Sequence, residues 1–391
     1  MPGGALEGSD VVVGRRAVRH RGALVLRRPM ARGQVDDWGD VERVWAHAYG
    51  ADEGLGIASD AHPLLLTEAP LNAAAHRERC AEVLFDRFNV PALFLAPQAI
   101  LSLYASGRTT GLVLDVGDGV SHAVPVYEGF AIAHAATRMD VAGRDVTERL
   151  GLLLRRAGRA FSTSAERDVV REIKERRCYV ARDPAADERA FAGLSSSSLA
   201  GGPGSTVSSS SSKNARAERD DPRVPPPAGD TNPQHHGESP QTTVPNLAEP
   251  AAALHELPDG SRLRLGPERF RAPEVLFDPS LVGSEDGGLA RVVDVAARRA
   301  DLDLRATLYA QIVLAGGSTM FPGFGDRLLH DLRLVSPPHT KLRIHAPPER
   351  MLSTWIGGSI LASLATFKTM WVLRSEYEEH GARLFSSRAL A

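Results

Sequence analysis

The sequence predicts an α/β fold, because strand-like and helix-like segments alternate along the chain on both sides of a low-complexity stretch. Its 391 residues are 43% hydrophobic and 24% charged, which is enough apolar material for a large core and for more than one domain. No internal period of roughly 20 to 50 residues recurs, so a repeat architecture is not expected.

Short apolar runs bounded by turn residues indicate strands, and longer segments between them indicate helices. Before the low-complexity stretch we expect a strand at 90–95, a helix at 97–106, strands at 111–115 and 120–127, and a helix at 163–179. After it we expect a strand at 261–265, a helix at 289–300, a strand at 311–315 and two helices within 354–371.

The N-terminal region is unusual, since residues 11–32 hold seven arginines and no acidic residue, as some transit peptides do. The region lacks the serine enrichment of such peptides. Turn residues at Gly14 and Gly22 flank strand-like runs at 11–13 and 23–26. We therefore expect folded sheet here rather than a targeting segment.

A stretch rich in Ser, Pro, Gly, Asn and His runs from residue 193 to residue 255 and contains almost no large apolar residue. Such a composition cannot bury enough surface to order itself, so we expect a disordered insertion. A flexible surface loop of this length costs the fold little, because closure entropy rises by only about 0.6 kcal/mol per doubling of length. A retained intron and a partner-binding tether both remain open for it.

Bulk properties exclude several classes of function. A formal net charge of -2 gives no general attraction for nucleic acid, and no apolar run is long enough to insert into a membrane. The only cysteines, Cys80 and Cys178, lack metal-like spacing and favour a reducing compartment such as the cytosol.

The candidate chemistry starts at a glycine-rich turn between two apolar strands, where Asp115, Gly117, Asp118 and Gly119 follow one another closely. Glycines at alternate positions let backbone N–H groups approach a phosphate, and two carboxylates three residues apart suit a hydrated Mg²⁺. Taken alone, these residues favour an ordinary Asp-Gly hairpin turn.

A second glycine turn, Gly316 and Gly317, follows another apolar strand, and a helix is expected to begin near 324–329. A strand, a glycine turn and a helix N-terminus together form a cradle for a nucleotide, although many α/β proteins carry such a turn without one. Two cradles in one chain indicate a cleft between two similar halves.

Several longer strings carry a family resemblance that covers nearly everything outside the insertion. The segments 98–111, 173–175, 315–323, 346–350 and 355–364 resemble the actin family. The resemblance implies a two-lobed actin-like fold of duplicated ribonuclease-H-like domains, with a nucleotide cleft and four subdomains. The implied division is 1–28 as a remnant of subdomain 2, 29–105 with 353–391 as subdomain 1, 106–141 with 285–352 as subdomain 3, and 142–284 as subdomain 4, which holds the insertion at 193–255.

The resemblance also implies ATP or ADP and Mg²⁺ as cofactors. Asp115, Gln98 and His122 would be the catalytic residues, with Gln98 and His122 orienting the attacking water, a role that needs no strong base. The nucleotide contacts would come from two loops and one helix: Asp115, Gly117, Asp118, Gly119, Lys174, Glu175, Gly316, Gly317, Ser318 and Met320. Asp115 and Asp118 would hold the metal through water. By residue type alone, Gln98 and His122 are ordinary polar residues of a helix start and a strand.

Within the family, the segments 89–94, 122–125, 323–327 and 376–383 resemble the actin-related proteins of the dynactin complex. That branch implies a head-to-tail filament of like subunits, with other dynactin subunits and dynein as partners and the cytoplasm, cytoskeleton, centrosome or microtubules as location. The role would be mainly structural, with at most a slow ATPase coupled to polymerisation. A conventional-actin-like protein and a nuclear chromatin-associated member stay open as alternatives, whereas no sugar-kinase motif is present.

The chain also departs from the family pattern. The match begins only at the DNase-binding-loop region, and no first phosphate loop of the form Asp-x-Gly-x-Gly-Lys is found. An incomplete gene model or a non-functional truncated product is therefore a further expectation. Val116 replaces a family serine and removes a hydroxyl donor to phosphate. Arg32 replaces a histidine that is often modified in actins, and Met351 replaces a lysine near the adenine.

Overall fold

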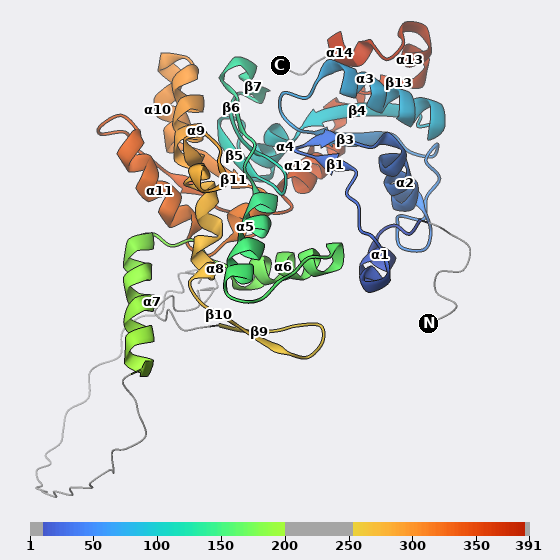
Figure 1. Cartoon of the computed structure of the whole chain (residues 1–391). Helices are drawn as coiled ribbons and strands as arrows, with labels where there is room; N and C mark the ends of the chain where they lie inside the picture. Colours follow the sequence, from blue (N-terminus) through green and yellow to red (C-terminus); the bar gives the residue numbers. More distant parts are fainter. Residues whose placement is uncertain (1–10, 200–252, 388–391) are drawn as a thin grey trace, which may run out of the picture. The chain divides into compact units, whose positions relative to one another are not determined.

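The computed structural model describes residues 11–199 and 253–387 (Figure 1). Internal contacts divide the chain into one unit of residues 1–185 and 252–391 and a second of residues 186–251. The helix α7 (Pro184–Leu199) crosses the boundary between the two, and every other helix and strand given below belongs to the first unit.

The predicted insertion lies mostly outside the described residues, but both of its bounds need correction. Residues 193–199 continue α7, and residues 253–255 lie in the strand β9 (Ala253–Glu256), which pairs antiparallel with β10 (Arg262–Leu265). His255 and Leu263 are opposite one another in this pair, and both are buried. A strand that depends on such a cross-strand partner does not stand out from its own composition.

The expected N-terminal sheet is wrong. Residues 11–29 contain no strand; they form the short helix α1 (Arg15–Arg19) and a 3₁₀ turn (Arg21–Ala23). No described strand pairs with the apolar run 23–26, and Val25 is 81% exposed. Arginine and alanine are good helix formers, and a strand without a partner leaves its backbone groups unpaired.

Sheet structure begins with a small hairpin of β1 (Met30–Ala31) and β2 (Gln34–Val35). Its two-residue turn has positive φ at both Arg32 (49°) and Gly33 (74°), the geometry that matches the natural twist of a hairpin. The helix α2 (Trp38–Tyr49) follows, and its N-cap Asp37 accepts a hydrogen bond from the Asp40 backbone N–H at 3.0 Å.

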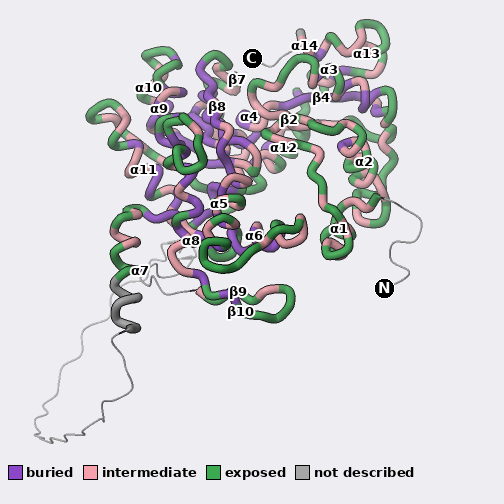
Figure 2. Tube along the Cα trace, in the orientation of Figure 1, coloured by how far each residue is buried: buried purple, intermediate pink, exposed green. Residues whose placement is uncertain are grey.

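One sheet has three strands in the order β13 (Val372–Leu373), β4 (Ala92–Pro97) and β3 (Leu64–Glu68). β4 is central and buried, whereas all five residues of the edge strand β3 are half-buried (Figure 2). Around the sheet, Phe85 stacks on Tyr377 with 4.4 Å between ring centroids. The helical elements of this region are α3 (Ala74–Glu82), a π turn (Val83–Arg87), a 3₁₀ turn (Ala365–Thr369), α13 (Arg374–His380) and α14 (Leu384–Ser387).

The second sheet has six strands and carries the glycine turns. Its order is β12 (Ile344–His345), β11 (Ile312–Ala315), β5 (Gly111–Val116), β6 (Ser121–Tyr127) and β7 (Phe130–Ala131), with β8 (Thr137–Met139) also paired to β6. β11 runs parallel to β5, and β5 and β6 form an antiparallel hairpin.

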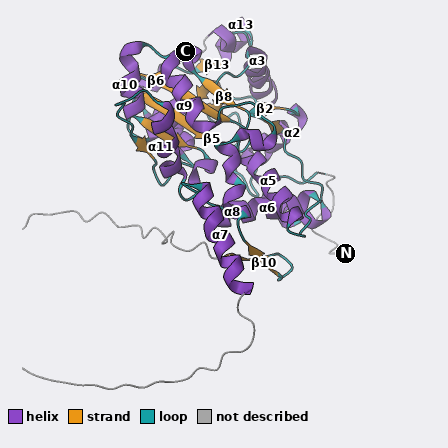
Figure 3. Ribbon diagram, turned by 60° about the vertical axis from the view of Figure 1, so that its left-hand side comes forward, coloured by secondary structure: helices purple, strands orange, loops and turns teal. Residues whose placement is uncertain are grey.

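Apolar side chains of this sheet and of the helices around it form the main core. In Figure 3 the orange strands lie among α9 (Gly288–Arg299), α10 (Leu302–Ala310) and α11 (Phe324–Val335), and α9 packs on β6 and β8. The remaining helical elements are α5 (Gly143–Arg156), α6 (Ser164–Arg177), α8 (Glu268–Arg271) and the 3₁₀ turns Ala133–Ala135, Pro273–Leu276, Pro279–Val282 and Gly317–Met320.

The helix α4 (Gln98–Ala105) packs closely against α12 (Ser353–Ser363). A Cβ on Gly357 would lie 1.8 Å from the carbonyl oxygen of Leu101, so the two backbones touch only because this residue is glycine. Among the described residues, no helix has both the length and the apolar character needed to cross a membrane.

The predicted α/β class is confirmed. The expected elements from residue 90 onward are present, with ends shifted by at most two residues. For α11 only the start was predicted. The second of the two helices expected within 354–371 is a 3₁₀ turn rather than an α-helix.

Candidate functional site

The turn between β5 and β6 has the features of an anion-binding loop. Its neck is closed by a hydrogen bond from the Gly117 N–H to the Val120 carbonyl at 3.1 Å. Within the described part of the chain, the backbone N–H groups of Asp118 and Gly119 make no hydrogen bond. Successive free amides in a tight turn form a concavity that suits a phosphate oxygen.

The second glycine turn lies directly beside the first, because β11 is parallel to β5 and Ala315 is opposite Asp115. Gly316 has φ 87°, and a Cβ there would lie 2.4 Å from both Asp115 Oδ1 and the Val116 carbonyl oxygen. Only glycine fits between the two turns. Gly317 faces open space, since a Cβ there would meet no atom of the described residues within 4 Å.

A third element, the start of α5, contacts the β5–β6 turn at Gly117. The Gly117 carbonyl accepts hydrogen bonds from the Gly143 N–H at 3.0 Å and from the Ser318 hydroxyl at 2.7 Å. A Cβ on Gly143 would lie 2.5 Å from Ser318 Oγ and 3.0 Å from the Gly117 carbonyl oxygen, so a side chain here would push the two segments apart. Three segments far apart in sequence therefore meet at one carbonyl group.

Lys174 supports this junction from behind. Its Nζ donates to the Gly143 carbonyl at 2.9 Å, the residue is only 5% exposed, and burial lowers the pKa of its ammonium group. Its neighbour Glu175 points to a different environment, where its half-exposed carboxylate pairs with Arg171 at 3.4 Å. Met320 ends the 3₁₀ turn and is 39% exposed.

Two of the predicted catalytic residues lie side by side. Asp115 and His122 are directly opposite in the β5–β6 ladder, so their side chains share one face of the sheet. Burial raises the pKa of Asp115 to about 6. Burial, with help from the nearby Arg138 charge, lowers the pKa of His122 to about 4, so its imidazole is neutral at pH 7. Its Nε2 is buried and has no hydrogen-bond partner in the described residues.

Gln98, the third predicted catalytic residue, begins α4, which packs on the same face of the sheet through Val113 and Val124. The far end of α4 is near the start of β5, where Leu103 would be 3.1 Å from a Cβ on Gly111. The helix start is thereby directed toward the end of β5 that carries Asp115. Gln98 and Val120 line a common cavity of about 170 Å³.

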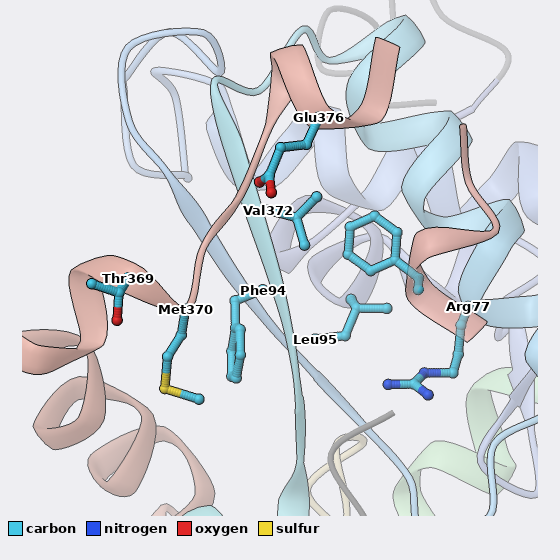
Figure 4. Close-up of a pocket in the computed structure, with 8 residues that line it drawn as sticks. Arg77, Phe94, Leu95, Thr369, Met370, Val372 and Glu376 are labelled. Carbon is cyan, nitrogen blue, oxygen red and sulfur yellow. The ribbon is translucent and has the colours of Figure 1, made fainter. Parts of the chain in front are cut away.

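A cavity of about 330 Å³ lies elsewhere, beside the three-stranded sheet (Figure 4). Phe94, Leu95, Met370 and Val372 form much of its lining, and none of its residues belongs to a glycine turn. Its one cation, Arg77, pairs with Glu68 at 3.0 Å. We interpret this cavity as imperfect packing around the sheet.

The expectation that Asp115 and Asp118 hold a metal through water stays a prediction, and the described residues contain no group of three or more His, Cys, Asp or Glu side chains placed to hold a metal ion directly. Asp118 instead has two cationic partners, Arg28 at 3.2 Å and Arg144 at 3.5 Å. The site thus fits the phosphates of a nucleotide through free amides and cationic side chains. It fits a cation poorly at Asp118.

Sequence reasoning missed several residues of this site: Gly143, Arg28, Arg144 and Arg350. Arg350 donates to the Thr319 carbonyl at 3.0 Å and its carbonyl accepts from the Gly316 N–H at 3.2 Å, which holds the second glycine turn in place. The helix start at Gly143 has a local signal, because Asp145 accepts a hydrogen bond from the Ala142 N–H at 2.8 Å, but that signal does not mark the role of the glycine. Nothing in the local sequence marks Arg28.

Comparison with known proteins identifies the family of this chain. The profile of the actin family matches residues 3–389, nearly the whole chain. The chain is also 48% identical over 378 residues to a protein described as "Actin-like protein" from Neurospora crassa, and the match spans 96% of this chain and 85% of that protein. The chain belongs to the actin family, and its α/β architecture is the actin fold.

Proposed function

We propose that this protein is an ATP- and ADP-binding cytoskeletal subunit, with the nucleotide phosphates held between the β5–β6 turn and the 3₁₀ turn that begins at Gly317. The observation that carries the proposal is the meeting of Gly143, Ser318 and Gly117 at one carbonyl, beside two free amides. These hydrogen bonds hold both glycine turns against the start of α5. Gln98, Asp115 and His122 would stand at its edge, where a neutral imidazole can orient a water molecule. The four-subdomain division given above belongs to the same proposal.

We further propose that the chain is of the centractin type, the filament-forming actin-related subunit of dynactin, which supports dynein-driven transport along microtubules. Its similarity to an actin-like protein and the four segments that resemble that branch support this assignment. Three exposed apolar side chains lie close together in sequence: Met351, Leu352 and Trp355. They support assembly, because exposed apolar patches mark protein interfaces. A head-to-tail contact that does not close generates a filament.

The nucleotide part of the proposal is tested by thermal unfolding of the purified chain with and without ATP. We expect ATP at about one hundred times its Kd to add about 2.7 kcal/mol of stability and to raise the midpoint measurably. GTP at the same concentration serves as the control for base selectivity. An unchanged midpoint with ATP would rule out a nucleotide-binding role for this chain.

The filament part is tested by sedimentation and negative-stain electron microscopy after addition of ATP. Short filaments of uniform length that bind purified dynactin subunits support the centractin assignment. Long filaments, or copolymers with conventional actin, would identify a conventional-actin-like protein instead. Binding to chromatin remodelling complexes without filaments would favour a nuclear family member.

A further inference from the structure

The segment of residues 21–33, here called the arginine segment, crosses the β5–β6 turn and is held at both ends. At one end Arg21 pairs with Asp168 at 2.8 Å and with Glu172 at 2.7 Å, both on α6. At the other end, Arg32 packs on the turn, since a Cβ on Gly119 would lie 3.1 Å from the Arg32 nitrogen. The intervening residues therefore run from α6 to the β5–β6 turn.

Arg28 lies between these anchors and reaches the turn itself. Its Nη1 donates to Asp118 Oδ2 at 3.2 Å, and its Nη2 is 4.0 Å from Asp168 Oδ1. The side chains of Arg28 and Asp118 are 49% and 45% exposed, so the pair is in contact with solvent and can separate at small cost. The neighbouring Arg27 is exposed and makes no hydrogen bond or ion pair with any described residue.

Several cationic side chains surround the Asp118 carboxylate. Arg28 and Arg144 contact its carboxylate, and Lys174 also interacts with it electrostatically. Arg171 is close enough to do the same but is already paired with Asp168 at 2.8 Å. A divalent cation approaching Asp118 would meet three positive side chains, whereas a polyphosphate would be attracted by them.

We propose that Arg28 is a phosphate-binding residue of this cleft, which leaves Asp118 for the polyphosphate of the ligand when the ligand binds. Asp118 is then a docking carboxylate that holds Arg28 in place in the empty site, and polyphosphate binding depends only weakly on a divalent cation. A guanidinium suits this exchange because its planar fork matches carboxylate and phosphate oxygens alike. The inference rests on the proposed nucleotide function and names the residue that contacts the phosphates.

The test measures binding of inorganic tripolyphosphate in EDTA by isothermal titration calorimetry to the full chain and to four variants. We expect R28Q to weaken binding at least about tenfold, because it removes a charge-assisted contact to phosphate, and R28K to weaken it less. The matched control R27Q should stay within about twofold of the parent chain, since Arg27 makes no polar contact with the described residues. Each variant is first shown to melt cooperatively at the parent midpoint.

The fourth variant, D118N, gives a result of opposite sign for the two roles of Asp118. If Asp118 only docks Arg28, D118N frees the arginine and removes a carboxylate that repels the ligand, so tripolyphosphate should bind D118N more tightly in EDTA. In the parent chain, added Mg²⁺ should change the affinity for ATP by less than about tenfold. The proposal fails if tripolyphosphate does not bind in EDTA. It also fails if R28Q and R27Q behave alike, or if D118N weakens ATP binding only when Mg²⁺ is present.

These outcomes are separate from the fate of the proposed function. Tripolyphosphate binding that depends on Arg28, with no stabilisation by ATP, would support the arginine site and refute the nucleotide function. Stabilisation by Mg-ATP that is unaffected by R28Q would support the nucleotide function and refute the arginine site.

Discussion

The substitution Gly143→Ala tests the junction on which the site depends. A Cβ at this position would lie 2.5 Å from Ser318 Oγ, 3.0 Å from the Gly117 carbonyl oxygen and 3.4 Å from Asp118 Cα. The hydroxyl can rotate away, but the Gly117 carbonyl belongs to the backbone of the turn and also accepts the Gly143 N–H bond. The start of α5 must therefore move away from the turn, and overpacking of this kind costs about 1–3 kcal/mol.

A matched control lies in the same helix. Gly151 is in the middle of α5, and a Cβ there would meet no atom within 4 Å. Alanine is the better helix former, so Gly151→Ala should stabilise the protein by about 0.5–1 kcal/mol. The two variants should differ by roughly 1.5–4 kcal/mol, which at about 2 °C per kcal/mol corresponds to roughly 3–8 °C in the thermal midpoint.

The assay is differential scanning fluorimetry of both variants, with and without ATP. We expect Gly143→Ala to melt below the parent chain and to gain less from ATP, and Gly151→Ala to melt above it and to gain the same. A midpoint for Gly143→Ala at or above that of the parent would refute the close packing of α5 on the turn. It would also remove the main support for a preformed phosphate site.

Two further predictions concern charge and assembly. Asp115 has its pKa raised from 3.8 to about 6, so its contribution to stability decreases as pH rises through that window, whereas His122, lowered from 6.5 to about 4, contributes stability that is lost as pH falls. Each effect amounts to about 3 kcal/mol, and they nearly cancel in the parent chain. As pH falls from 6.5 to 4, D115N should lose stability relative to the parent and H122N should gain stability relative to the parent, both measured by urea titration. Stability profiles of the two variants that run parallel to that of the parent would contradict both pKa values. Trp355 is 72% exposed and should act as an interface anchor. W355S should leave the thermal midpoint unchanged and raise the critical concentration for assembly about tenfold or more, whereas L302S, at an exposed site on α10, should leave the critical concentration unchanged. Equal assembly of the two variants would exclude this surface from the filament contact.

The parts of the site that sequence predicted are those with a local pattern. The β5–β6 turn and the Gly316 turn each follow a buried strand, and both appear where the apolar runs end. Their adjacency was not predicted: the two turns were expected to mark a cleft between two similar halves, whereas both follow neighbouring parallel strands, β5 and β11, of one sheet. Asp115 and His122 are seven residues apart on a hairpin, so the turn length alone places them opposite one another.

The parts that sequence did not predict depend on long-range partners. The strand β9 exists because β10 pairs with it, and residues 23–26 are not a strand because no other strand lies alongside. Gly143 looks like any first residue of a helix. Its requirement for glycine comes from Gly117 and Ser318, which are 26 and 175 residues away in sequence.

The arginines of the N-terminal region show why charge composition could not identify their roles. In sequence, Arg21, Arg27 and Arg28 are equivalent cations in a basic stretch. In the fold, Arg21 pairs with α6, Arg27 points to solvent, and Arg28 pairs with Asp118, which is 90 residues away. Each assignment depends on which carboxylate lies within about 4 Å, and that distance is set by the packing of α6 and the β5–β6 turn rather than by neighbours in sequence. A basic segment can therefore place one arginine against the β5–β6 turn without any local motif that reveals it, and single-residue variants are needed to find its role.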